Sequence, residues 1–277
     1  MQSEPAILSA YPLRETDAAG RHFSYREAGS GPALVLLHGI GSGSGSWGHQ
    51  LAAFSGSHRV VAWDAPGYGG SANLAPPSPV AADYASALQA LLDTLGIERC
   101  LLLGHSLGAL MAASFAADRP DRVAGLVLAD PARGYGDAAE IERKSKLYAR
   151  LAQIDRLGPE GLARERGAAL LGPDPTPDAL ALVRWNMARL RIDGHDQAAR
   201  LLSNGILKQD VGRWQGPLLV LWGAEDTITP PAACRSVAEG HPTARTAEIA
   251  GAGHASYVDR PLAFNDLLRD FAGGLDT

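Results

Sequence analysis

The segment GHSLG, residues 104–108, combines a serine with the local backbone that a nucleophile needs. It directly follows an apolar run and directly precedes a segment rich in small residues. A serine at a sharp strand-to-helix turn has its Oγ aimed away from the backbone, and small neighbours leave room for that turn. The pattern predicts that Ser106 is a nucleophile. The alternative is a serine that only caps a helix.

A serine hydroxyl is a weak nucleophile near neutral pH and needs a general base. The candidate is His254, in the small-residue loop GAGHAS between the strand-like segment TAEI and the last predicted helix. His105 is too close to Ser106 in the chain for its ring to turn onto the hydroxyl. We therefore predict that His254 is the base, and the alternative is an ordinary surface-loop histidine.

Two aspartates are candidates for the acid that orients the imidazole and stabilises its charged form. Asp226 lies just beyond the predicted strand PLLVLWG, and Asp130 ends the predicted strand GLVLAD. We favour Asp226, because its loop is longer and closer in sequence to His254, and because the order Ser106, Asp226, His254 is typical of one hydrolase architecture. Asp130 is the alternative acid. A turn or helix-cap role is the alternative for Asp226.

Backbone N–H groups must hold the negative charge that develops on a carbonyl oxygen under attack. One predicted donor is Leu107, directly after the nucleophile. The other is Ile40, in the loop HGIG at residues 38–41. Together these groups predict acyl transfer to water through an acyl-enzyme, with no cofactor and no metal.

A dinucleotide-like pattern in the same region competes with this interpretation. Gly43, Gly45 and Gly48 match G-x-G-x-x-G, and Asp64 ends the next predicted strand. The glycines do not follow the strand directly, however, and Trp47 interrupts the turn that would face a phosphate. A nucleotide site also leaves GHSLG unexplained, so we do not favour it.

These groups need a sheet to bring them together, and the chain alternates apolar runs with helical segments. This alternation predicts a mostly parallel sheet with helices on both faces. Weaker segments at 6–14 and 22–27, with turn residues at 17–20, predict a hairpin at the sheet edge. The predicted strands are 33–38, 59–64, 100–105, 125–130 and 217–223, and the predicted helices are 81–95, 107–118 and 261–271.

The alternation stops between residues 134 and 215, where helical patterns occur without a convincing strand. We predict a helical cap over the carboxyl edge of the sheet, at 134–215, inserted into a core of 1–133 and 216–277. Arg184, Trp185 and Arg191 in this cap are candidates for binding an acidic substrate, although their helical spacing is also typical of ordinary core and surface positions.

The composition narrows the possible partners. The 277 residues carry a net charge of −5 without a basic cluster, which argues against nucleic acid and anionic membranes. Cys100 and Cys234 lie far apart in the chain, so we expect reduced, buried thiols and a cytoplasmic protein. We find neither an export leader nor an apolar run of about 18 residues.

Taken together, these segments resemble the α/β-hydrolase superfamily, in its small-molecule branch of esterases, enol-lactonases and meta-cleavage-product hydrolases. The resemblance implies an eight-stranded sheet, hydrolysis of a small ester or lactone, and no cofactor. A carbon–carbon hydrolase is an alternative, although such enzymes often have Asn and Trp where this chain has His105 and Ala255. A binding or receptor protein on the same fold is another alternative. The segments that carry the resemblance are HGIG, DAPGYGGS, GHSLG, GAEDTITP and GAGH.

Overall fold

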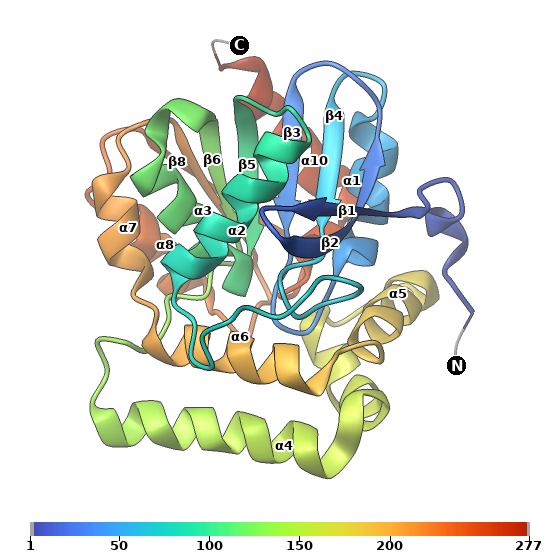
Figure 1. Ribbon diagram of the computed structural model, residues 1–277, viewed down its shortest axis with the longest axis vertical. Coiled ribbons are helices and arrows are strands. Elements are labelled where there is room, and N and C mark those ends of the chain that lie inside the picture. Colours follow the sequence, from blue (N-terminus) through green and yellow to red (C-terminus); the bar gives the residue numbers. More distant parts are fainter. Residues whose placement is uncertain (1–2, 276–277) are drawn as a thin grey trace.

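A computed structural model describes residues 3–275 and contains a single eight-stranded sheet (Figure 1). The strand order is β1-β2-β4-β3-β5-β6-β7-β8, and β2 pairs antiparallel with both β1 and β4, whereas all other pairs are parallel. The prediction of a mostly parallel sheet is confirmed. The strands are β1 Leu13–Ala18, β2 Arg21–Ala28, β3 Ala33–Leu37, β4 Arg59–Trp63, β5 Cys100–His105, β6 Val123–Ala129, β7 Leu218–Gly223 and β8 Ala244–Ile249.

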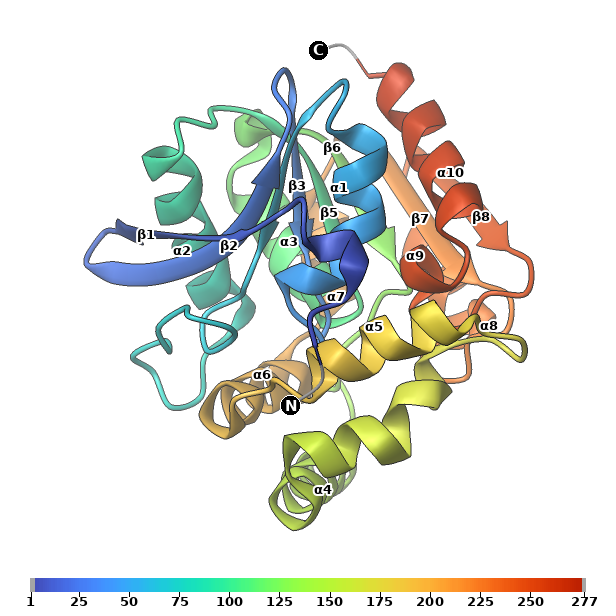
Figure 2. The same ribbon diagram turned by 90° about the vertical axis from the view of Figure 1, so that its right-hand side faces the viewer.

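Helices cover both faces of this sheet, as Figure 2 shows from the side. The strands β5 and β7 are buried along their whole length, because side chains on each face meet a helical layer. Two apolar clusters result, one on each face. One face carries α2 Ala81–Thr94, α3 Leu107–Asp118, α7 Leu207–Arg213 and α8 Pro231–Ala238, and the other carries α1 Gly48–Phe54, α9 Ser256–Asp259 and α10 Pro261–Gly273.

The N-terminal hairpin exists, but its first strand was predicted too early. Ala6–Leu8 forms a short 3-10 helix, and β1 begins only at Leu13. The side chain of Leu8 is fully buried in the apolar cluster on one face of the sheet. This segment therefore packs on the face of the sheet and does not extend β1 along its edge. The chain reverses at Ala19 and Gly20, both of which have positive φ.

Three long helices lie beyond the carboxyl ends of the strands, at the bottom of Figure 1. They are α4 Glu140–Arg166, α5 Pro177–Met187 and α6 Ile192–Asn204, and the fully described stretch 130–217 contains no strand. The short helix α7 also lies within the predicted cap range, but it packs against α3 on the face of the sheet. The division into a core and a cap at 134–215 stays a prediction.

A kink in α4 bends its second half relative to the first. Gly158 has φ 63° and ψ 173°, far from helical values, and Pro159 follows it. Glycine tolerates a positive φ, and proline cannot donate the hydrogen bond that a continuous helix needs. Both parts of α4 therefore contribute side chains to the same cavity, which is described below.

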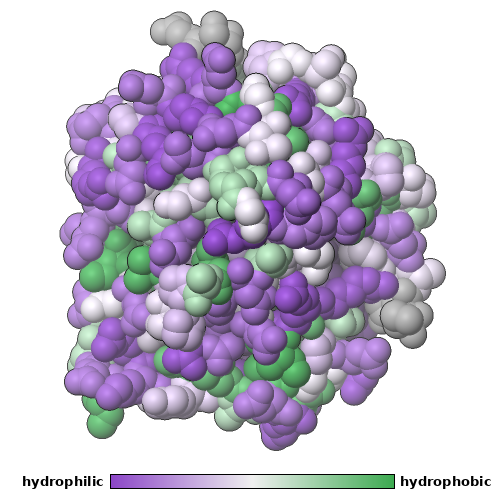
Figure 3. Space-filling view, viewed as in Figure 1, coloured by the Kyte–Doolittle hydropathy of each residue, from purple (hydrophilic) through white to green (hydrophobic). Residues whose placement is uncertain are grey.

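The surface is largely hydrophilic on the face drawn in Figure 3, with only small, separate hydrophobic patches. Among the described residues, no helix combines the length and the apolar character that crossing a membrane requires. Both cysteines, Cys100 and Cys234, are buried and not bonded to each other.

The crossing of β3, β5 and α3 leaves no space for side chains at two glycines. A Cβ atom built on Gly108 would lie 2.4 Å from the carbonyl oxygen of Leu37, and one built on Gly104 would lie 2.3 Å from the carbonyl oxygen of Gly108. Both obstacles are backbone atoms, which cannot turn aside. The flanking glycines of GHSLG are therefore a packing requirement of the sheet and helix.

We expect Gly108→Ala to lower the free energy of unfolding by about 1–3 kcal/mol, because the new methyl group forces backbone atoms apart. Gly212→Ala in α7 is the matched control. Nothing lies within 4 Å of a Cβ there, so this helix should be equally stable or more stable. Urea denaturation followed by circular dichroism measures both. A Gly108→Ala protein as stable as Gly212→Ala would contradict the close packing.

Candidate active site

Ser106 occupies a strained turn between β5 and α3. Its backbone has φ 51° and ψ −115°, in a region that costs a residue other than glycine about 1–3 kcal/mol. The turn is held on both sides, because the Ser106 N–H donates to Ala129 O at 2.9 Å and Ser106 O accepts from the N–H of Ala109 at 3.0 Å. The side chain lines a cavity beyond the strand ends.

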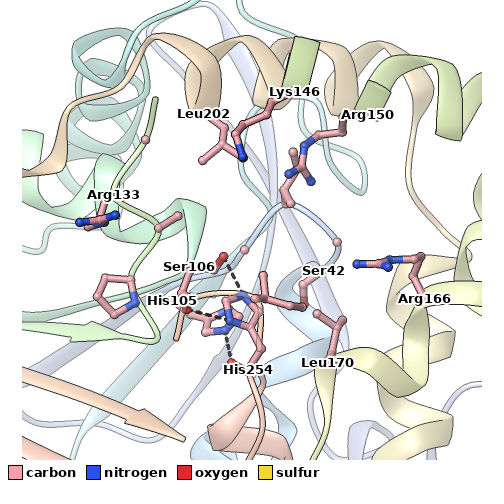
Figure 4. Close-up of a pocket in the computed structure, with 18 of the residues that line it drawn as sticks. Ser42, His105, Ser106, Arg133, Lys146, Arg150, Arg166, Leu170, Leu202 and His254 are labelled. Carbon is pink, nitrogen blue, oxygen red and sulfur yellow. Dashed lines mark hydrogen bonds between the residues drawn. The ribbon is translucent and has the colours of Figure 1, made fainter. Parts of the chain in front are cut away.

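His254 lies directly against this serine. The Ser106 hydroxyl donates to His254 Nε2 at 2.9 Å, and His254 Nδ1–H donates to Asp226 Oδ2 at 2.8 Å (Figure 4 shows the serine–histidine bond). All three side chains are buried. The structure thus brings the three residues together in one unbroken chain of hydrogen bonds, from hydroxyl to carboxylate.

The Asp226 carboxylate is fixed by the loop that follows β7. Its Oδ1 accepts from the N–H groups of Ile228 at 2.7 Å and Thr229 at 3.0 Å, and its Oδ2 accepts from the Thr229 hydroxyl at 2.6 Å. Burial alone raises the pKa of Asp226, but the hydrogen bonds from His254 and Thr229 outweigh it and hold the pKa below its usual value. The carboxylate is therefore negative and fixed in orientation. Sequence reasoning missed Thr229, although the loop DTIT is typical of an Asx turn.

Asp130, the alternative acid, does not contact His254. Its Oδ1 accepts from Gly223 N–H at 2.8 Å, and its Oδ2 lies 2.5 Å from the Ser256 hydroxyl. The side chain is completely buried, and burial, followed by repulsion from Asp226, raises its pKa well above the usual value. Asp130 therefore links β6, β7 and α9, and its carboxyl group favours the protonated form.

His105 has a positioning role that sequence reasoning did not find. Its Nε2–H donates to the backbone carbonyl of His254 at 2.8 Å, across 149 positions of sequence. Burial, followed by the neighbouring His254, lowers the pKa of His105 to about 3, so the ring is neutral near pH 7. This bond anchors the loop of His254 to the end of β5, directly before Ser106.

The two predicted oxyanion donors, Ile40 and Leu107, belong to segments that lie next to Ser106. Leu107 is the first residue of α3, where backbone N–H groups have no partner within the helix. Ile40 lines the cavity, and its carbonyl accepts from the Tyr68 hydroxyl at 2.9 Å. A Cβ on Gly39 would lie 3.0 Å from the Ser106 Cβ, so this loop runs directly beside the serine.

The dinucleotide-like pattern at residues 43–48 does not form a phosphate cradle. A Cβ on Gly45 would lie 2.6 Å from the ring of Trp185, so the glycine packs against protein. The N–H of Ser44 donates to the Asp64 carboxylate at 2.7 Å. A phosphate would need that donor, and the carboxylate would repel it.

A cavity of about 970 Å³ separates the serine from α4. The predicted substrate-binding residues of the cap are not among those that line it. Arg191 donates to Ser71 O at 2.7 Å and to Asn73 Oδ1 at 2.9 Å, Trp185 is buried in an apolar cluster, and the stem of Arg184 covers Gly167. These side chains thus hold ordinary packing and hydrogen-bonding positions, which is the alternative that their helical spacing indicated. The cavity is lined instead by the acidic residues Asp137 and Glu142, by other polar and apolar residues, and by five cations, Arg133, Lys146, Arg150, Arg156 and Arg166.

Comparisons with known proteins agree with this geometry. A family model described as alpha/beta hydrolase fold matches residues 32–261. A putative carbamate hydrolase RutD of Pseudomonas savastanoi is 30% identical over 87% of this chain and 93% of its own. A 2-hydroxy-6-oxononadienedioate/2-hydroxy-6-oxononatrienedioate hydrolase of Paraburkholderia phymatum is 30% identical over 90% of each. The enol-lactonase of Burkholderia xenovorans superposes with a TM-score of 0.81 at 25% identity, over 94% of this chain and 100% of that one.

The raised pKa of Asp130 predicts a pH dependence of stability. The folded protein binds this proton more tightly than the unfolded chain, so the contribution is present at low pH and is lost as the pH rises from about 4 towards the raised pKa. Asn at this position does not titrate and can still donate to Ser256. As the pH rises from about 4 into the neutral range, wild type should lose unfolding free energy relative to Asp130→Asn.

Urea denaturation at a series of pH values measures this difference. Asp174→Asn is the matched control, because Asp174 is exposed and its replacement should leave the pH dependence of wild type unchanged. A constant difference between wild type and Asp130→Asn over the whole pH range would contradict the buried, protonated carboxyl group.

Proposed function

The chain belongs to the α/β-hydrolase family and is an enzyme, and on that basis we propose that it is a serine hydrolase that cleaves a carboxylic ester or lactone of a small organic substrate. One observation carries this proposal: the hydrogen-bonded series Ser106, His254, Asp226 opens into a cavity large enough for such a molecule. The proposed reaction uses only groups of the chain, so it needs no cofactor.

The first half of the reaction forms an acyl-enzyme. His254 Nε2 removes the proton of Ser106 while Oγ attacks the substrate carbonyl carbon. The Asp226 carboxylate holds Nδ1–H in place and stabilises the imidazolium that results. As the tetrahedral intermediate collapses, Nε2–H gives its proton to the departing alkoxide, so the bond between the carbonyl carbon and the leaving oxygen breaks without a free alkoxide.

The negative charge of that intermediate falls on the former carbonyl oxygen. We assign its stabilisation to the N–H groups of Ile40 and Leu107, which are fixed by the loop after β3 and by the start of α3. Fixed donors stabilise a developing charge without the reorganisation that water would need. The positive end of the α3 dipole acts in the same direction.

The second half regenerates the serine. Water takes the place of the leaving group, His254 Nε2 removes one of its protons, and the hydroxide attacks the acyl carbon. The new tetrahedral intermediate expels Ser106 Oγ, which recovers a proton from His254. The carboxylic acid product then leaves the cavity.

Hydrolysis of a carbon–carbon bond is the second candidate function. The observation that favours it is the 30% identity with the nonadienedioate hydrolase of Paraburkholderia phymatum. The residues beside the proposed triad favour the ester or lactone instead, since His105 and Ala255 stand where carbon–carbon hydrolases often have Asn and Trp. Turnover of a vinylogous 1,5-diketone without turnover of 4-nitrophenyl esters would favour the second candidate.

Asp226→Asn tests the assignment of the acid. An amide cannot stabilise the imidazolium, so we expect kcat for a 4-nitrophenyl ester to fall about 10³–10⁴-fold. Asp130→Asn is the matched control, because the same change there removes no bond to His254. A loss of activity in Asp130→Asn with none in Asp226→Asn would reverse the assignment.

A further inference from the structure

One face of α4 supplies a row of polar side chains to the cavity. Lys146, Arg150 and Gln153 follow one another at spacings of four and three residues, which places them on the same side of a helix. Arg166 comes from beyond the kink at Gly158 and lines the same space. Figure 4 shows Lys146 and Arg150 reaching from one helix towards the side of the cavity that holds Ser106, and Arg166 pointing in from beside them.

These cations differ in how their charge is balanced. Lys146 has Glu142 at 3.6 Å, and Arg156, which also lines the cavity, has Glu165 at 3.7 Å. Within residues 3–275, neither Arg150 nor Arg166 has an acidic side chain within 4.0 Å. Among the described residues, Arg133 also lines the cavity without an acidic side chain within 4.0 Å, and the acidic Asp137 and Glu142 line it as well. The guanidinium groups of Arg150 and Arg166 thus face the cavity without an ion-pair partner of their own.

Arg150 is the more enclosed of the two. It is partly buried, whereas Arg166 is exposed. The pKa of Arg150 is lowered, chiefly by burial. The nearby Tyr135 and Tyr68 oppose this effect, and the like charge of Arg166 adds to it. An arginine nevertheless keeps its proton in a protein. Its charge is therefore partly desolvated and beside a like charge, which an incoming anion would relieve.

The neighbouring histidine does not supply this charge. His195 on α6 is buried and lines the cavity beside Arg150. Burial, followed by repulsion from Arg150, lowers its pKa to about 4, so it is neutral near pH 7. The positive charge at this end of the cavity comes from arginine and lysine, and it persists over the whole neutral pH range.

We propose that Arg150, assisted by Arg166, binds a carboxylate at the far end of the acyl chain, so that the preferred substrates are esters or lactones of acids that carry a second, free carboxylate. A guanidinium group presents two parallel N–H donors to the two oxygens of a carboxylate, which fixes its orientation as well as its charge. The cavity of about 970 Å³ accommodates the chain between this group and Ser106. This inference rests on the proposed ester or lactone hydrolysis.

The test compares esters of equal chain length with and without the second carboxylate. The 4-nitrophenyl monoesters of adipic and suberic acid are paired with 4-nitrophenyl hexanoate and octanoate. For at least one pair, wild type should show a kcat/KM about tenfold to a hundredfold higher for the ester that carries the free carboxylate than for its partner. This is the range expected from a charge-assisted hydrogen-bonded pair. In Arg150→Met this ratio should fall at least tenfold, chiefly through a higher KM.

Arg164→Met is the matched control. It removes the same charge from the same helix, but Arg164 is exposed and does not line the cavity. The ratio should keep its wild-type value in this variant. Equal ratios in wild type and Arg150→Met, or an equal fall in Arg164→Met, would overturn the carboxylate site while the proposed hydrolysis stands.

A binding measurement separates the two proposals. Adipate is titrated calorimetrically into the Ser106→Ala protein, with and without the additional change Arg150→Met. We expect binding that weakens at least tenfold with the additional change. If wild type cleaves none of these esters, the proposed hydrolysis fails for esters, and the titration alone decides whether the carboxylate site exists. Adipate affinity equal in both proteins, or no tighter than that of inorganic phosphate, would overturn it.

Discussion

The close contact between α3 and the backbone of β3 is the constraint on which the site depends. Because Gly108 and Gly104 carry no Cβ, the helix begins directly at the end of β5, and Ser106 must adopt its strained turn. The same contact places the start of α3 and the loop after β3 next to Ser106. The strain is therefore a local cost that the packing of the whole sheet offsets.

Two aspartates near the site differ in charge because of their partners. Asp226 receives hydrogen bonds from His254, a hydroxyl and two backbone N–H groups, and these outweigh burial. Asp130 has fewer donors, is completely buried and lies near the first carboxylate, so its pKa rises. Separation of the two pKa values leaves one negative charge beside the imidazole, where the proposed proton transfer from Ser106 needs it.

The sequence predicted the features of this site that depend on the order of residues along the chain. It did not predict the features that depend on contacts between distant segments. Strands buried on both faces leave continuous apolar runs, and the order Ser106, Asp226, His254 follows from the order of those strands. The bond from His105 to the His254 carbonyl has no sequence signal. The sequence patterns predicted the helices between residues 134 and 215. The face of each helix that lines the cavity depends on tertiary packing, however, so the sequence did not identify Arg150.

The central claim is that Ser106 is a nucleophile activated by His254, and covalent labelling tests it most directly. The native protein is incubated with a fluorophosphonate, its intact mass is measured, and the modified peptide is identified alongside Ser106→Ala. A single adduct on Ser106, absent from the variant, is the predicted result. No adduct on wild type, or an adduct on another residue that Ser106→Ala retains, would contradict the account.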